Sequence, residues 1–193
     1  MNLDELTRMV ESKPAPAPLL ALQAFVNTVD VESGVDLLDS PTEFRDWLRD
    51  TELESQRMAI SAADLRRARR LRDTFRTLLS ANATGELDSR AAGTLRSEAR
   101  KRRIPLTAGP DGRLGLDISP VHSVDDLLSL LVGVAFQAQV EGQWERLKLC
   151  RNDECRWAFF DSSRNRGGTW CEMSVCGNRI KNRHYRRRHP ARA

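Results

Sequence analysis

The sequence has no cysteine outside residues 150–176, only one tyrosine and no long apolar run. None of its hydrophobic stretches approaches the ~18 residues that a membrane-spanning helix needs. The opening MNLDELTRMV carries acidic residues and lacks the basic start and apolar run of a secretory signal. We therefore expect a cytoplasmic protein with no membrane partner.

The usual marks of an active site are also missing. No glycine-rich phosphate loop, no paired-carboxylate site and no nucleophile–histidine–acid arrangement stands out. The 193 residues, 40% of them hydrophobic and 30% charged, are still enough to bury a core. We expect one domain with a small attached module and no enzyme activity.

Charge is distributed unevenly along the chain. Residues 1–145 hold 18 Lys and Arg against 23 Asp and Glu, whereas residues 146–193 hold 13 against 4. The overall charge of +4 therefore hides a tail that carries nine excess positive charges. A compact module with such an excess attracts polyanions such as DNA or RNA.

The first third of the chain predicts an arm followed by buried helices. The Pro-Ala-Pro-Ala-Pro run at residues 14–18 cannot continue a helix, so residues 1–18 are expected to be an arm that holds at best a short helix. The apolar run over 19–29 fits a buried helix or strand, and we favour a helix although periodicity alone cannot decide.

Four polar residues with helix-capping side chains precede apolar stretches and predict helix starts: Ser40, Ser61, Asp88 and Ser123. The helix from Ser61 carries an apolar stripe and is followed by Gly85, and the helix from Asp88 is expected to reach Arg103. The helix after Ser123 contains LLSLLVGVAF, which is apolar nearly all round and is the best candidate for the centre of the core. Residues 104–107 and 114–118 flank a Gly-Pro-Asp-Gly turn and predict a β-hairpin.

A basic stretch, Arg-Arg-Ala-Arg-Arg-Leu-Arg, occupies residues 66–72. Acidic residues lie nearby in the sequence, and the apolar stripe of the same helix uses the other face. We favour a solvated face here over a nucleic-acid contact.

Four cysteines form two pairs with the spacing C-x4-C: Cys150 and Cys155, then Cys171 and Cys176 after 15 further residues. Two chelating pairs are what a tetrahedral thiolate site needs, and Zn²⁺ is the default metal for it. Four thiolates fill the coordination sphere, so the site is expected to be structural. The alternatives are an iron–sulfur cluster or four unpaired core cysteines.

The 15-residue connection between the cysteine pairs leaves room for a hairpin, with residues 157–160 outbound and Thr169-Trp170 returning. The aromatic residues of this segment are too few to fold residues 146–193 alone. Structural zinc in isolated fingers contributes roughly 10–16 kcal/mol, so the metal is expected to stabilise the module.

Six basic residues follow the last cysteine closely: Arg179, Lys181, Arg183, Arg186, Arg187 and Arg188. If this segment is helical, Arg179, Arg183 and Arg186 share one face, which could enter a major groove or lie along phosphates. The alternative is a solvated, frayed tail. We favour nucleic-acid contact because the charge has one sign and adjoins a metal-fixed scaffold.

We expect structural or surface roles for the three histidines and for Asp161. His184 and His189 could replace a thiolate, but four cysteines suffice, so both are expected at the surface or on phosphates. His122 is expected in a loop. Asp161 could cap the turn after the first strand of the finger or pair with Arg179.

Residues 150–188 resemble the CGNR zinc finger. The matching positions are Cys150, Cys155, Trp157, Phe159 to Asp161, Ser163 to Asn165, Trp170, Cys171, Met173, Cys176 to Arg179 and Lys181. Upstream, Phe25-Val26-Asn27-Thr28 followed by Asp39-Ser40-Pro41 resembles the ABATE domain, which precedes this finger in bacterial proteins regarded as stress-induced transcription regulators.

This resemblance implies a mainly α protein with a small β-hairpin. It implies a helical ABATE-like domain over residues 19–145 and a treble-clef-like, DNA-binding CGNR-type finger with a basic C-terminal helix over 146–193. One departure is Gly167-Gly168-Thr169 before Trp170, where family members often carry arginines. Phosphate contact from that hairpin should be weaker, which leaves the helix to make it.

We therefore expect a zinc-dependent DNA-binding protein that regulates transcription. The finger would contact DNA, and the N-terminal domain would sense a signal such as a small-molecule effector or mediate association. The alternative is a non-enzymatic, zinc-stabilised adaptor that binds RNA or an acidic protein surface. The sequence leaves the DNA site, the effector, the direction of regulation and the oligomeric state open.

Overall fold

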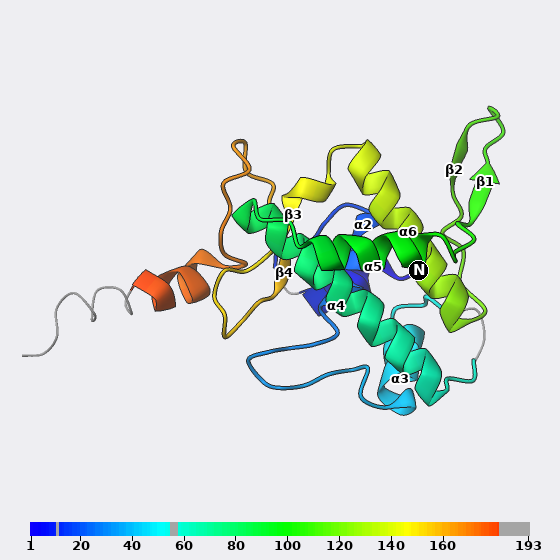
Figure 1. The fold of residues 1–193 in the computed structure, drawn as a ribbon, viewed down its shortest axis with the longest axis horizontal. Helices are drawn as coiled ribbons and strands as arrows, with labels where there is room; N and C mark the ends of the chain where they lie inside the picture. Colours follow the sequence, from blue (N-terminus) through cyan, green and yellow to red (C-terminus); the bar gives the residue numbers. More distant parts are fainter. Residues whose placement is uncertain (11, 55–57, 182–193) are drawn as a thin grey trace, which may run out of the picture.

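The computed structural model describes residues 1–10, 12–54 and 58–181, which form a helical body with a projecting β-hairpin at one end and the cysteine-rich segment at the other (Figure 1). The helices are α1 (Leu3–Val10), α2 (Leu19–Val26), α3 (Pro41–Asp50), α4 (Ala62–Thr84), α5 (Ser89–Ala99) and α6 (Val124–Val140). The strands are β1 (Leu106–Ala108), β2 (Leu114–Leu116), β3 (Leu147–Leu149) and β4 (Ala158–Phe160). The predicted fold class, mainly α with a small hairpin, is confirmed.

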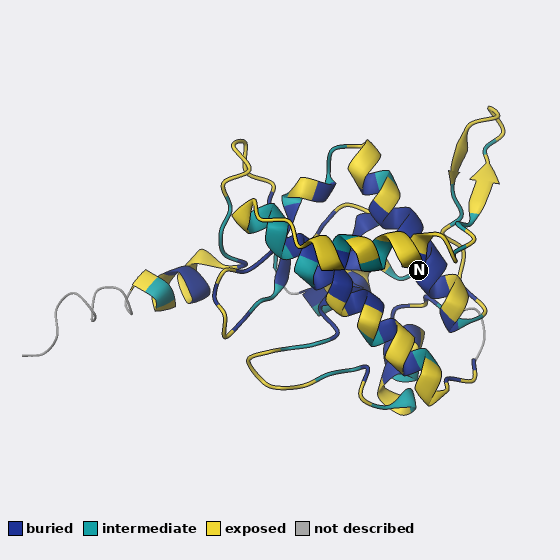
Figure 2. Ribbon diagram, in the orientation of Figure 1, coloured by how far each residue is buried: buried dark blue, intermediate teal, exposed yellow. Residues whose placement is uncertain are grey.

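The apolar helices α2 and α6 pack together at the centre of the core. All eight residues of α2 are buried, so the run at 19–29 begins with a helix enclosed on every side. The helix α6 is central along most of its length, as its apolar sequence predicts. Its C-terminal end, however, is more exposed (Figure 2). Phe136 is 63% exposed and Val140 is 71% exposed.

The predicted helix starts are confirmed. Four residues each accept a hydrogen bond on the side chain from the backbone N–H three residues later: Ser40, Ser61, Asp88 and Ser123. Asp64 also accepts from the N–H of Ser61 and completes a capping box. The helix α4 ends at Gly85, whose φ of 79° is the left-handed conformation that favours glycine.

The helix α5 ends at Ala99, short of the expected Arg103. Beyond Ala99 the N–H groups of Lys101 and Arg102 bond to carbonyls three residues back, so the chain tightens into a turn instead of continuing as an α-helix.

The basic stretch at residues 66–72 is only partly a solvated face. Arg66, Arg67 and Arg70 are exposed, as expected. Arg72 is only 4% exposed, because its guanidinium pairs with the carboxylate of Asp36 at 2.9 Å. The expectation was wrong at this position because α4 packs that side against the loop between α2 and α3, where the cation holds the loop in place.

The N-terminal segment is packed into the helical body. The helix α1 lies against α2, and Leu6 and Val10 have no exposed surface. Residues 1–18, expected as an arm, thus contribute to the core, while the domain boundaries at 18 and 145 remain predictions. None of the described helices is both long enough and apolar enough to cross a bilayer.

Candidate metal centre

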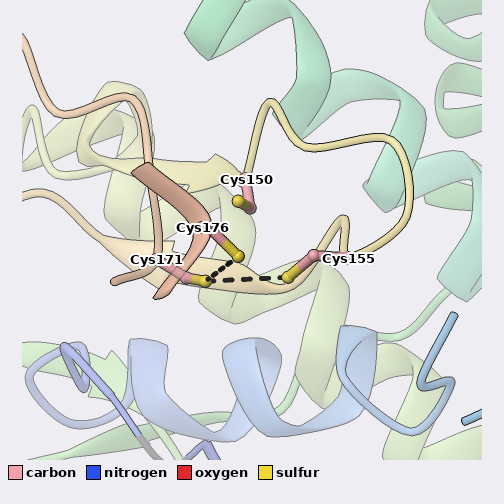
Figure 3. A group of neighbouring side chains, drawn as sticks. All are labelled: Cys150, Cys155, Cys171 and Cys176. Carbon is pink, nitrogen blue, oxygen red and sulfur yellow. Dashed lines mark hydrogen bonds between the residues drawn. The ribbon is translucent and has the colours of Figure 1, made fainter. Parts of the chain in front are cut away.

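Four cysteine sulfur atoms meet in one buried cluster (Figure 3). The Sγ atoms of Cys150, Cys155, Cys171 and Cys176 all lie within 4.8 Å of one another. The Sγ of Cys171 lies 3.6 Å from that of Cys155 and 3.7 Å from that of Cys176. A tetrahedral zinc ion with Zn–S bonds of about 2.3 Å holds its sulfur ligands about 3.8 Å apart. The cluster therefore has the donor set and the spacing of a structural zinc site.

The first cysteine pair lies in the turn of an antiparallel hairpin. Strands β3 and β4 pair with Leu147 opposite Phe160 and Leu149 opposite Ala158, so Cys150 follows β3 directly and Cys155 precedes β4. Within the turn, the carbonyl of Asn152 accepts hydrogen bonds from the N–H groups of Cys155 and Arg156, each at 2.9 Å. The hairpin thereby fixes both thiols on one side of the turn.

Asn152 also supports the metal site with its side chain. It has no exposed surface, and its Nδ2 donates to the Sγ of Cys176 at 3.7 Å. A donor aimed at a thiolate stabilises the negative charge and orients the ligand. Asn152 therefore links the first cysteine pair to the second.

The second cysteine pair comes from an extended segment and the π-helical turn Met173–Gly177, which continues into helical residues 178–181. Gly177 lies close to Met173, since a Cβ atom at this position would displace the Sδ of that exposed side chain. A hairpin turn that carries two thiols, followed by a helix start that carries another, is the arrangement of a treble clef. Cys176 thus anchors the beginning of the helical segment 178–181.

The predicted hairpin partner of residues 157–160 was wrong. The strand β4 pairs with β3, and not with Thr169-Trp170. Instead, the carbonyl of Thr169 accepts a hydrogen bond from the N–H of Arg151 at 3.2 Å. The reason is that Leu147 and Leu149 can bury their side chains against α4 while they pair with β4, whereas residues 167–169 contribute two glycines and no apolar side chain.

The four thiols lie too close together to ionise independently. Interaction with Cys155 and Cys171 lowers the pKa of Cys150 to about 2, whereas interaction with Cys150 raises the pKa of Cys155 to about 12. The pKa of Cys171 is also raised, first by Cys150 and then by Cys155. Such a cluster can hold four negative charges only together with a cation, which a divalent metal supplies.

A buried ion pair holds the loop between β4 and Cys171. The Nζ of Lys148 lies 2.8 Å from a carboxylate oxygen of Asp161, and both side chains are about 5% exposed or less. The N–H groups of Ser163 and Gly168 also donate to this carboxylate. Burial alone would raise the pKa of Asp161, but the hydrogen bonds from Lys148 and Ser163 outweigh it and lower the pKa.

These contacts decide between the two roles expected for Asp161. It caps the turn at Ser163, as one expectation held, and its cationic partner is Lys148 rather than Arg179. The sequence alternation Leu147-Lys148-Leu149 was the available signal, because it places the lysine on the opposite face of a strand from two core residues. Gly168 is needed beside this pair, since a Cβ atom there would lie 2.6 Å from the Asp161 carboxylate carbon.

Two polar side chains fasten the finger to the helical body: Gln23 on the apolar helix α2, and Asn27 at its C-terminal cap. The amide of Asn27 accepts from the N–H of Ala158 at 2.8 Å and donates to its carbonyl at 3.0 Å, as a neighbouring strand would. Gln23 donates to the same carbonyl at 3.1 Å and accepts from the N–H of Ala15. Sequence reasoning missed these roles, although polar residues four apart on an otherwise apolar helix were a usable signal.

A third contact joins α4 to the cysteine turn. The guanidinium of Arg76 donates to the carbonyls of Val26 and Arg156 at 2.8 and 3.0 Å. Burial lowers the pKa of Arg76 to about 10. The finger therefore shares its base with the helical body: Leu147, Leu149 and Ala158 belong to the main core, while Phe159 packs with the cysteines.

The predicted nucleic-acid contacts are only partly within the described residues. Arg179 and Lys181 are exposed on the helical residues that follow Cys176. Arg183, Arg186, Arg187 and Arg188 lie outside the described residues, as do His184 and His189. His122 is exposed in the loop before α6, as expected.

Two family models match the chain. One, described as "CGNR zinc finger", matches residues 146–189. The other, ABATE, described as "Putative stress-induced transcription regulator", matches residues 20–139. The search of curated proteins found no match. The two families occur in the order that the sequence predicts.

Proposed function

The chain belongs to the ABATE family and carries a CGNR zinc finger behind that domain, and from this premise we propose that it regulates transcription by binding DNA through the finger. The zinc ion would be held by the four cysteines and would fix the fold of the finger. A sphere filled by four thiolates has no open position for a reacting water, so we propose no catalytic role for it. We place the protein in the cytoplasm, where such thiols stay reduced.

The observation that carries this proposal is that the helical segment 178–181 begins directly after Cys176, one of the four candidate zinc ligands. The turn that holds Cys176 leads within two residues into the helical segment 178–181, which exposes Arg179 and Lys181 to solvent. Side chains on a metal-fixed helix lose less conformational freedom when they bind phosphate than side chains on a loose tail. Arg183, Arg186, Arg187 and Arg188 would extend the same basic segment.

The helical domain touches the finger close to the cysteines, which supports a role in sensing a signal. The Nζ of Lys13 donates to the carbonyl of Trp170 at 2.6 Å, and the Oγ of Ser12 donates to that of Cys171 at 3.3 Å. The indole of Trp157 donates to the carbonyl of Val10 at 2.8 Å. A change in the packing of α1, for example on binding an effector, would reach the zinc site through these contacts.

Salt-dependent binding to duplex DNA tests the proposal. Each phosphate contact should add roughly 0.9 to the steepness of log K against log salt. Arg183→Ala/Arg186→Ala should weaken binding and flatten this slope by about two such contacts. Arg66→Ala/Arg70→Ala is the matched control, because it removes two exposed arginines from α4.

Two outcomes would contradict the proposal. A larger loss in the Arg66/Arg70 variant would place the contact surface on the helical domain. If zinc-loaded wild type bound no duplex at any salt concentration, the adaptor function would replace DNA binding, and affinity for RNA or an acidic protein would then decide which adaptor.

A further inference from the structure

The hairpin β1–β2 has an apolar face that the rest of the described chain covers only at its base. Opposed residues of an antiparallel pair share a face, as do residues two apart in one strand. Leu106, Ala108, Leu114 and Leu116 therefore lie on the same side of the hairpin. Leu106 is 61% exposed and Leu114 is 74% exposed. A two-stranded sheet of this size is marginal in water unless its apolar face is covered.

The base of the hairpin rests on α6 at a glycine. A Cβ atom at Gly133 would lie 2.7 Å from the Cδ2 of Leu116 and 2.9 Å from the Cγ2 of Ile104, so a side chain here would push the base of the hairpin away from α6. Phe136 and Val140 follow Gly133 by three and seven residues and lie on the same face of the helix. Leu116 thus covers only part of this apolar face of α6. The rest of the face exposes the large side chains of Phe136 and Val140.

We propose that these two surfaces form the interface between two copies of this chain. Leu106 and Leu114 of each copy would lie against Phe136 and Val140 of the other copy. A two-fold axis satisfies both surfaces at once, because each copy supplies one hairpin and one helix face. Apolar side chains gathered in this way mark association sites rather than ordinary surface.

Charges beside the apolar residues favour a second copy over an unrelated partner. Arg113 adjoins Leu114 on the hairpin, and Glu141 follows Val140 at the end of α6; both are exposed. Within the chain, the guanidinium of Arg113 lies 3.8 Å from the carboxylate of Asp111, which is a loose contact. The symmetric arrangement brings Arg113 of one copy to Glu141 of the other, twice. The tip of the hairpin and the end of α6, which meet in the proposed dimer, therefore carry opposite charges.

This interface is compatible with the proposed function but does not rest on it. The hairpin lies at the opposite end of the molecule from the last helical turn of the finger (Figure 1). A dimer formed through the hairpins would leave both fingers accessible.

Sedimentation of the full zinc-loaded chain over a range of concentrations tests the interface. Wild type should dimerise, and Leu114→Asp or Phe136→Asp should each raise the dimer dissociation constant about tenfold or more, because each buries an unpaired carboxylate. Leu87→Asp is the matched control: Leu87 is 69% exposed but lies outside the interface. A chain that is monomeric at every concentration would overturn the proposal. So would a dimer that neither substitution weakens.

Charge reversal tests the symmetric arrangement itself. Arg113→Glu and Glu141→Arg should each weaken the dimer, since each places like charges together at both ends. The double variant should restore the wild-type dissociation constant, because every contact then again joins opposite charges. If the double variant is weaker than either single variant, the hairpins do not lie on α6 of the other copy. Zinc content and circular dichroism establish that each variant is folded.

Discussion

The guanidinium of Arg179 lies 2.7 Å from the carboxylate of Glu32, and this ion pair joins the helical turn after Cys176 to the loop between α2 and α3. Both side chains are about half exposed, so the pair contributes little to stability. Its consequence concerns binding, because Arg179 is also one of the proposed phosphate contacts.

Glu32→Gln should increase the affinity for duplex DNA about two- to fivefold at low salt, since a weak surface pair no longer competes with phosphate. Fluorescence anisotropy with labelled DNA measures this change. Glu86→Gln, which removes the same charge from the exposed turn after α4, should have little effect. In an Arg179→Gln background the gain should disappear. An unchanged or lower affinity in Glu32→Gln would show that Glu32 does not compete for Arg179.

Purified protein should hold one zinc ion per chain, because the four thiolates complete a tetrahedral sphere. Cys171→Ser should bind far less, since Cys171 lies within 3.7 Å of two other sulfur atoms. Elemental analysis after reconstitution measures both. Less than about half an equivalent in wild type, where a structural site should be nearly full, would contradict the assignment, as would equal zinc in the variant.

Removal of zinc by a chelator should unfold the second half of the finger and leave the hairpin β3–β4 folded. Residues 168–181 should lose amide protection because the metal holds Cys171 and Cys176 together. The strands β3 and β4 should stay protected, since Leu147, Leu149 and Ala158 belong to the main core. Hydrogen exchange read by mass spectrometry distinguishes the two regions. Equal loss of protection in both would mean that the helical body does not hold the hairpin without metal.

Asn27→Ala should lower the free energy of unfolding by about 2–3 kcal/mol, because it leaves the buried N–H of Ala158 without a partner and removes one donor from its carbonyl. Urea denaturation with excess zinc measures the change. Asn165→Ala, in the exposed loop of the finger, serves as the control and should cost little. If the two substitutions lowered the free energy of unfolding equally, the hydrogen bonds between Asn27 and Ala158 would not be what attaches the finger to the helical body.

Lys148→Met should destabilise the fold by about 3–5 kcal/mol, because it leaves the buried carboxylate of Asp161 unpaired. The pKa of Asp161 is lowered in the folded chain, so its contribution is complete above the unfolded pKa of about 3.9 and is lost as the pH falls through the folded pKa. In Asp161→Asn the free energy of unfolding should therefore fall less steeply than in wild type as the pH drops below about 4. Thermal unfolding across pH checks both, and a wild-type slope in Asp161→Asn would contradict the argument.

The sequence by itself determined the zinc ligands and most helix starts. Two cysteine pairs with short loops can satisfy one tetrahedral ion with little help from the rest of the chain. The cap at Ser61 works in the same local way, since its bonds to Asp64 span three residues. Spacing and capping chemistry are visible in a short window of sequence, so these features could be predicted.

Only the tertiary structure decided which distant segments meet. Residues 158–160 could pair with either flanking segment, and burial of Leu147 and Leu149 against α4 selected β3. The buried carboxylate of Asp161 required a cationic partner, and packing made that partner Lys148. Arg179 pairs with Glu32 instead. Strand partners and ion pairs depend on long-range packing, which composition and periodicity do not record. The same holds for Arg72, whose burial follows from the loop that α4 packs against.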